Sequence, residues 1–136
     1  LKTMLRLSAE RSELRIVGDQ FGCPTYAQDL AKTIVTILES LQSKKTISCL
    51  YHFSGNFFCS WAEFSRAIFD EAFELGVIAS KPNVVAITTK EFPTLAKRPA
   101  RSELSSKKIR STFGIDPSDR KLGIRSSLIA IKNEIH

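Results

Sequence analysis

The chain has 136 residues, of which 43% are hydrophobic and 25% are charged, with a mean hydropathy of −0.07. This composition supports one domain with a core of its own and excludes a disordered chain. No apolar run approaches the roughly 18 residues that a membrane span needs, and no segment has the pattern of a signal peptide. We therefore expect a cytoplasmic protein without a membrane partner.

The net charge of +6 suits an anionic partner. Phosphate, nucleic acid and acidic protein all remain open from charge alone. The positive charges are dispersed and no recognised nucleic-acid-binding module is present, so we expect no nucleic-acid partner.

Cysteine and histidine provide no convincing reactive or metal site. Cys49, His52 and Cys59 come nearest to a zinc set, but positions 49 and 52 would point to opposite faces of a strand. A cysteine nucleophile paired with His52 would lack an orienting group. We expect reduced thiols and no bound metal.

Short β-like runs alternate with helical ones, and the predicted order is α-β-α-β-α-β-α-α. A helix is expected over residues 1–11 and a strand over 14–17, which ends at Gly18. The first helix has no N-cap residue before it, so we expect either a single α/β domain over 1–136 or a fragment of a longer protein.

The clearest helix begins after Thr25, which is predicted to be its N-cap, with Gln28 completing a capping box. Its apolar residues recur at helical spacing and form one stripe. The stripe contains Ala27, Leu30, Ala31, Ile34, Leu38 and Leu41. A buried strand is then expected over 47–53, because this run is rich in β-forming residues.

Ser60 and Glu63 form a second predicted capping box, which opens a helix that ends at Gly76. Trp61 in its first turn is more typical of packing than of base stacking. A strand over 84–88, a long loop over 89–106 and helices over 106–113 and 119–135 complete the chain. Strands separated by helices favour parallel crossovers within a layered α/β sheet.

Two motifs of dinucleotide-dependent reductases are missing. None of the glycines forms a Gly-rich strand-to-helix turn of the G-x-G-x-x-G type. Neither Tyr26 nor Tyr51 is followed four residues later by lysine, so the Tyr/Lys proton-donor pair is also absent. We expect no catalytic residue in this chain.

Two loops are candidates for binding. Lys97, Arg98 and Arg101 could hold a phosphate, because the planar guanidinium fits two phosphate oxygens, or they could form a solvated basic loop. The segment 18–26 could be a simple strand-to-helix turn. It could also place Asp19, Gln20 and Thr25 at the edge of a ligand cleft, since α/β sheets bind ligands beyond the carboxyl ends of their strands.

Several segments together resemble the dTDP-4-dehydrorhamnose reductase family, in the same order and over nearly the whole chain. The D-Q-x-G-x-P-T and P-T-x-x-x-R-P runs are the most specific of them. The segments are 1–7, 19–25, 50–55, 60–64 and 92–99. Cys23 departs mildly from the family pattern, where a small residue such as serine or alanine is expected.

The resemblance implies a Rossmann-like extended short-chain dehydrogenase/reductase that uses NADPH or NADH to reduce dTDP-4-dehydro-L-rhamnose to dTDP-L-rhamnose. This chain matches only the C-terminal, substrate-binding half. The dinucleotide-binding half, with its Gly-rich turn and Tyr/Lys pair, would precede Leu1. We therefore expect this chain alone to be inactive and to bind no cofactor.

By the same resemblance, Asp19, Gln20, Pro24 and Thr25 would shape the loop over the dTDP-sugar. Arg98, with Lys97 or Arg101, would neutralise the diphosphate.

Two alternatives remain beside the enzyme. Relatives of this fold also serve as regulatory subunits that bind a nucleotide-sugar without turnover. A truncated reading frame is the other alternative, and it would leave apolar surface exposed and favour a homodimer.

Overall fold

The computed structural model describes residues 1–42 and 50–135. Its α/β class agrees with the prediction. The elements in chain order are α1 (Lys2–Glu10), β1 (Glu13–Val17), β2 (Phe21–Gly22), α2 (Ala27–Gln42), β3 (Cys59–Ser60), α3 (Trp61–Glu74), β4 (Asn83–Ile87), the 3-10 turn η1 (Thr89–Glu91), α4 (Lys107–Phe113) and α5 (Arg120–Ile135). No helix in these two ranges is long and apolar enough to cross a membrane.

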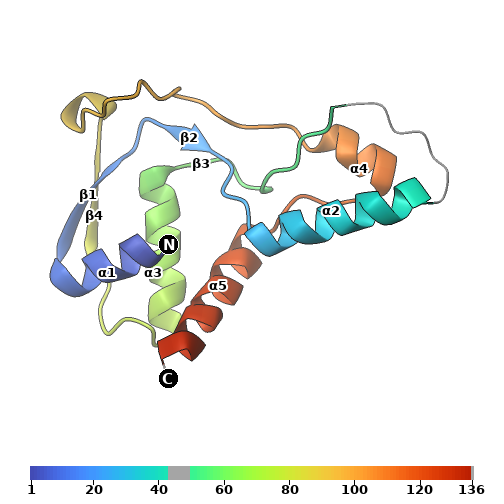
Figure 1. The fold of residues 1–136 in the computed structure, drawn as a ribbon. Coiled ribbons are helices and arrows are strands. Elements are labelled where there is room, and N and C mark those ends of the chain that lie inside the picture. Colours follow the sequence, from blue (N-terminus) through green and yellow to red (C-terminus); the bar gives the residue numbers. More distant parts are fainter. Residues whose placement is uncertain (43–49, 136) are drawn as a thin grey trace.

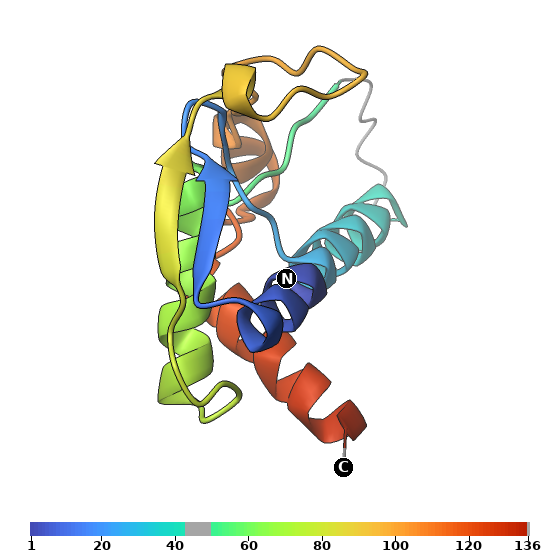
Figure 2. The ribbon, with the colours of Figure 1, turned by 90° about the vertical axis from the view of Figure 1, so that its left-hand side faces the viewer.

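A parallel pair of strands forms one side of the core. β1 and β4 pair in register, with Leu14 opposite Val84, and both side chains are buried against Phe69 of α3. In Figures 1 and 2, α3 runs along one face of this strand pair, and α1 lies beside α3. The expected parallel crossover therefore brings two segments almost 70 residues apart into one sheet.

A second cluster joins α3 to α5. Ile68 and Ala72 of α3 pack against Ile124 and Leu128 of α5, and all four are at most 4% exposed. The apolar side chains of α1, including Met4, cover the edge of this cluster. The helices α1, α3 and α5 thus share one continuous interior with the β1–β4 pair.

Local signals set the ends of α3 and α4 as predicted. Ser60 and Glu63 form the expected capping box at the start of α3. Gly76 follows the last turn of α3 with φ +63°, and Gly114 follows α4 with φ +70°, both in the left-handed region that glycine adopts without strain.

Other expectations are wrong. The strand predicted over 47–53 lies partly outside the described residues, and residues 50–53 form no strand. Instead of one layered sheet, the described residues form two two-stranded sheets, in one of which β2 pairs with β3 in antiparallel fashion. Thr25 does not cap α2. Its hydroxyl donates to the carbonyl of Cys23 and accepts a hydrogen bond from the amide of Gly55.

The stripe predicted on α2 forms but is not covered by the described residues. Figure 1 shows α2 extending away from α3 and the β1–β4 pair, and Figure 2 shows the same from the side. Five large apolar side chains of this helix are between 42% and 54% exposed. They are Leu30, Ile34, Val35, Leu38 and Leu41. We call this set the open face of α2.

Candidate functional site

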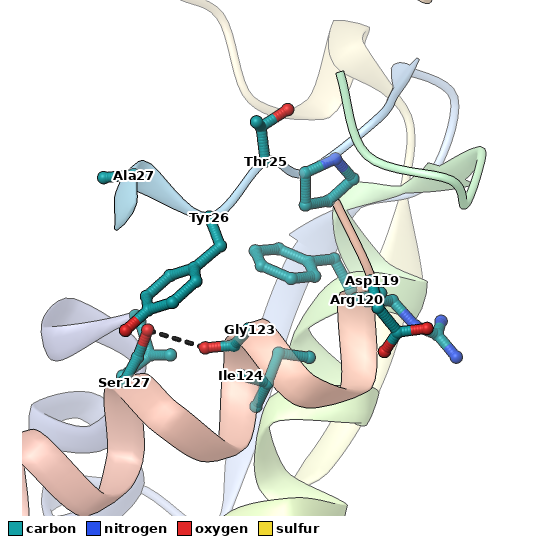
Figure 3. Close-up of a pocket in the computed structure, with 11 residues that line it drawn as sticks. Thr25, Tyr26, Ala27, Asp119, Arg120, Gly123, Ile124 and Ser127 are labelled. Atoms are coloured by element: carbon teal, nitrogen blue, oxygen red, sulfur yellow. Dashed lines mark hydrogen bonds between the residues drawn. The ribbon is translucent and has the colours of Figure 1, made fainter. Parts of the chain in front are cut away.

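A cavity of about 290 Å³ lies where the segment after β2 meets the beginning of α5. Pro24 and Thr25, two of the predicted site residues, lie on its wall. Figure 3 shows the ring of Tyr26 directed toward Gly123 and Ser127 of α5. The remaining wall is largely apolar and includes Phe64, Ile124 and Leu1.

The absence of a side chain at Gly123 allows this arrangement. A Cβ atom there would lie 2.9 Å from the Cβ of Tyr26, closer than two carbon atoms can pack. Ser127 donates its hydroxyl hydrogen to the carbonyl of Gly123 at 2.8 Å (Figure 3). The site therefore offers aromatic and aliphatic surface with a few polar groups, which is typical of small-molecule pockets.

Charged groups at one end of the cavity are already engaged. The carboxylate of Asp119 caps α5 by accepting from the amide of Leu122 at 2.9 Å, and this bond holds the pKa of Asp119 below its ordinary 3.8. The guanidinium of Arg120 lies 3.6 Å from the ring centre of Phe57. This end of the cavity therefore carries both signs of charge.

Hydrogen bonds from distant segments fix the Pro-Thr-Tyr turn. The amide of Tyr26 donates to the hydroxyl of Ser118, which in turn donates to the carboxylate of Asp29 at 2.7 Å. Gly55 approaches so closely that a Cβ atom there would overlap the carbonyl of Pro24. The turn is thus held by residues far along the chain.

Asp19 and Gln20, at the end of β1, do not line this cavity. Both carboxylate oxygens of Asp19 accept from the amide of Thr89 at 2.9 Å, and one accepts from its hydroxyl at 2.6 Å. Gln20 is buried and donates to the same hydroxyl at 3.1 Å. The side-chain and backbone hydrogen bonds from Thr89 lower the pKa of Asp19 from 3.8.

The loop of residues 92–101, here called the basic loop, is exposed throughout. Among the described residues, neither Lys97 nor Arg98 has an ion-pair partner. Arg101 differs, because it pairs with Glu103 at 2.7 Å and lies 4.6 Å from the ring centre of Phe58. The structure therefore leaves two of the three predicted phosphate-binding cations without a counter-charge and gives the third a local partner.

In the described ranges Cys23 and Cys59 are partly or fully buried, whereas Trp61 is 49% exposed at the start of α3. Cys59 is buried, and burial raises the pKa of its thiol, so it is a weak nucleophile. Cys23 is half-buried. Trp61 packs edge-on against Phe64, with ring centres 6.4 Å apart. In the same ranges no group of three or more His, Cys, Asp or Glu residues could hold a metal.

The described residues do not fit a dinucleotide pyrophosphate. Such a group binds where a Gly-rich turn presents backbone N–H groups at the N-terminus of a helix. Here the two glycines with positive φ, Gly76 and Gly114, follow helix C-termini, where carbonyl oxygens carry partial negative charge. We assign no step of a redox reaction to this chain.

The sequence interpretation missed Tyr26, Asp119 and Gly123 at the cavity, and Ser118, which holds the amide of Tyr26 from outside it. Gly123 could have been found from the sequence, because glycine destabilises the interior of a helix. A glycine inside a predicted helix therefore indicates that another residue packs closely against it. Ser118 gave no such signal, since its partners are 89 and 92 residues away.

Comparison with known proteins gives consistent results. The family model described as the RmlD substrate binding domain matches residues 1–132. A dTDP-4-dehydrorhamnose reductase of Aggregatibacter actinomycetemcomitans is 46% identical over 127 residues, which is 93% of this chain and 43% of that protein. This chain therefore spans less than half the length of that relative.

Solved structures show the same relation. A dTDP-4-dehydrorhamnose reductase from Clostridium acetobutylicum superposes with a TM-score of 0.80 at 30% identity, over 96% of this chain and 43% of that one. The dTDP-4-dehydrorhamnose reductase of Bacillus anthracis, solved in complex with NADP, gives a TM-score of 0.76 at 34% identity. The match covers 95% of this chain and 41% of that one.

The fold and the sequence together define an α/β substrate-binding domain. The chain belongs to the RmlD substrate-binding domain family.

Proposed function

We propose that this chain is the substrate-binding part of a dTDP-4-dehydrorhamnose reductase. The observation that carries the proposal is the match of residues 1–132 to the substrate-binding domain family, with reductase relatives that extend well beyond the matched region. The ligand is then the dTDP-sugar. The reduction needs a nucleotide-binding portion that holds NADPH or NADH, so residues 1–136 alone are inactive.

The basic loop is the part of this chain best suited to the diphosphate. Lys97 and Arg98 are exposed, and within the described ranges neither has an acidic partner that a phosphate would have to displace. Charge-assisted hydrogen bonds to phosphate oxygens are among the stronger polar contacts, and arginine can make two at once. Arg101, which already pairs with Glu103, contributes less.

The open face of α2 is the surface on which the nucleotide-binding portion packs. Five adjacent apolar side chains on one helix are too many to leave in water when a partner is available. More than half of the Aggregatibacter relative lies outside the region matched by this chain, which provides such a partner.

The test is a chimaera in which the corresponding amino-terminal portion of the Aggregatibacter reductase precedes Leu1. We expect it to consume NADPH when dTDP-4-dehydrorhamnose is added. Arg98→Ala should raise KM about tenfold, as expected for the loss of one charge-assisted bond to phosphate, with a smaller change in kcat.

Arg11→Ala is the matched control, because Arg11 is an exposed arginine at the end of α1. An unchanged KM in Arg98→Ala would contradict the role of the basic loop. A chimaera that binds dTDP but does not turn over would indicate a binding module instead of an enzyme.

A further inference from the structure

The three residues that follow Gly18 hold the basic loop at both of its ends. Just before its beginning, Asp19 and Gln20 bind Thr89, the first residue of η1, whose carbonyl accepts from the amide of Phe92. At its end, the amide of Phe21 donates to the carbonyl of Ala100 at 2.8 Å, and the carbonyl of Phe21 accepts from the amide of Ser102 at 3.0 Å. One short segment therefore fixes where the loop leaves the domain and where it returns.

Between these two ends the loop has little support from the described residues. Residues 92–100 are all exposed, and Leu95 is fully so. In the part of the chain that the structure describes, the hydroxyl of Thr94 bonds to the carbonyl of Ala96, within the loop itself. A loop with few buried contacts opens easily, so its average position depends on its attachments.

The Asp19–Thr89 contact is the strongest of these attachments on chemical grounds. It joins an ionised carboxylate to both a hydroxyl and an amide, and such charge-assisted bonds are about twice as strong as neutral ones. The hydroxyl of Thr89 donates to Asp19 while it accepts from Gln20, so the three side chains form one connected network.

We propose that Asp19 is a positioning residue: its hydrogen bonds to Thr89 hold the basic loop where Lys97 and Arg98 meet the diphosphate of the nucleotide-sugar. The ligand part of this inference rests on the proposed function. A free carboxylate close to a bound diphosphate would repel it. The hydrogen bonds from Thr89 stabilise the ionised carboxylate of Asp19, so its charge persists and its favourable effect on binding would have to come from the loop attachment.

This inference and a simple charge argument predict opposite results for Asp19→Asn. Removing a negative charge near the basic loop should strengthen anion binding if charge alone matters. If Asp19 acts by positioning the loop, the same substitution should weaken binding. We expect the dissociation constant of dTDP for the 136-residue chain to rise about fivefold, the equivalent of one ordinary hydrogen bond.

Thr89→Val removes the hydroxyl and keeps the shape, and Thr89→Ser is the matched variant that restores it. We expect Thr89→Val to weaken dTDP binding as much as Asp19→Asn does, and Thr89→Ser to bind like the parent. The double variant should bind little more weakly than either single one, because both changes remove the bond between the Thr89 hydroxyl and the Asp19 carboxylate. Additive losses would mean that Asp19 touches the ligand itself and would overturn the inference.

Amide exchange measured without ligand separates this inference from the proposed function. Thr89→Val should accelerate exchange of the Phe92 amide, which bonds to the carbonyl of Thr89, about tenfold. Exchange within α3 should not change. Asp116→Asn serves as the control, because Asp116 is an exposed aspartate that pairs with Arg110 far along the chain.

The outcomes are distinguishable. Unchanged exchange at Phe92 would overturn the positioning role whatever the binding results. Faster exchange with unchanged dTDP affinity would also overturn it, because the contact would then only stabilise the loop. A parent chain that binds no dTDP would overturn the proposed function and the ligand role of Asp19, while the exchange data would still show whether Asp19 restrains the loop.

Discussion

The helices α2 and α3 have the same kind of amphipathic sequence but opposite surroundings. In α3 the apolar residues Ile68, Phe69 and Ala72 are at most 1% exposed. In α2 the only buried residue is Thr33, and the apolar stripe forms the open face. An amphipathic pattern therefore predicts that the apolar face of a helix packs against something. Whether that face is buried depends on which other elements lie beside it.

The difference also indicates which helices are buried by other elements of this chain and which are not. The β1–β4 pair, α1 and α5 cover α3 within the described residues. The relatives are more than twice as long as the matched region, and α2 is the element with the most apolar surface left over. We therefore expect the stability of the chain to depend on α3 and its association with other chains to depend on α2.

The largest effect should come from Phe69→Ala compared with Leu38→Ala. Removing the buried ring leaves a cavity between α3 and the β1–β4 pair and should lower the free energy of unfolding by about 3–5 kcal/mol. Leu38 is 54% exposed, so its truncation should change that free energy by no more than about 0.5 kcal/mol. Urea denaturation of both variants measures the difference. Equal losses would mean that α2 is covered in solution.

A smaller effect is expected at the start of α3, where Ser60 and Glu63 cap the helix. Ser60→Ala should cost about 1 kcal/mol. The hydrogen bonds from the backbone and side chain of Ser60 hold the pKa of Glu63 below its ordinary 4.5. Since the folded state depresses this pKa, the stabilisation is present above pH 4.5 and is lost as the pH falls below it.

Glu63→Gln tests this pH dependence. Between pH 6 and pH 3 its unfolding free energy should fall less steeply than that of the parent chain, because the pH-sensitive cap is gone. If the unfolding free energy of parent and variant depends on pH with the same slope, the pKa of Glu63 is the same in the folded and unfolded states and the prediction is wrong.

The smallest effect on stability, and the clearest effect on association, should come from Ile34→Glu combined with Leu38→Glu. Both positions are at least half exposed, so the unfolding free energy should change by no more than about 0.5 kcal/mol. The parent chain should self-associate through the open face of α2 as its concentration rises, whereas the double variant should sediment as a monomer. In the chimaera, the same pair should impair folding of the joined protein. A parent chain that stays monomeric at high concentration would contradict self-association through the open face of α2.

Local signals predicted much of the fold. The parallel strands β1 and β4 and the helices α3, α4 and α5 begin and end within one or two residues of the expected positions, because caps and left-handed glycines act on neighbouring residues. Residues 50–53 were predicted to be a strand from composition alone. No strand forms there in the described structure, because β propensity cannot supply a partner strand.

The candidate site was harder to predict. Thr25 has the chemistry of an N-cap, but its hydroxyl bonds to Gly55, 30 residues away. Asp19 and Gln20 contact Thr89, about 70 residues away, which no local pattern indicated, and their place beside a ligand stays a prediction. The roles of Lys97 and Arg98 toward a phosphate stay predictions.

The sequence by itself determined the α/β class, the ends of α3 and α4 and the family, because periodicity, capping and short motifs depend on residues close together in the chain. Only the tertiary structure decided which polar side chains meet and which apolar faces are covered. Asp19 contacts Thr89, Ser118 contacts Asp29, and the apolar stripe of α2 stays exposed. Hydrogen bonds and burial require groups to be close in space, and chain order alone does not fix that proximity.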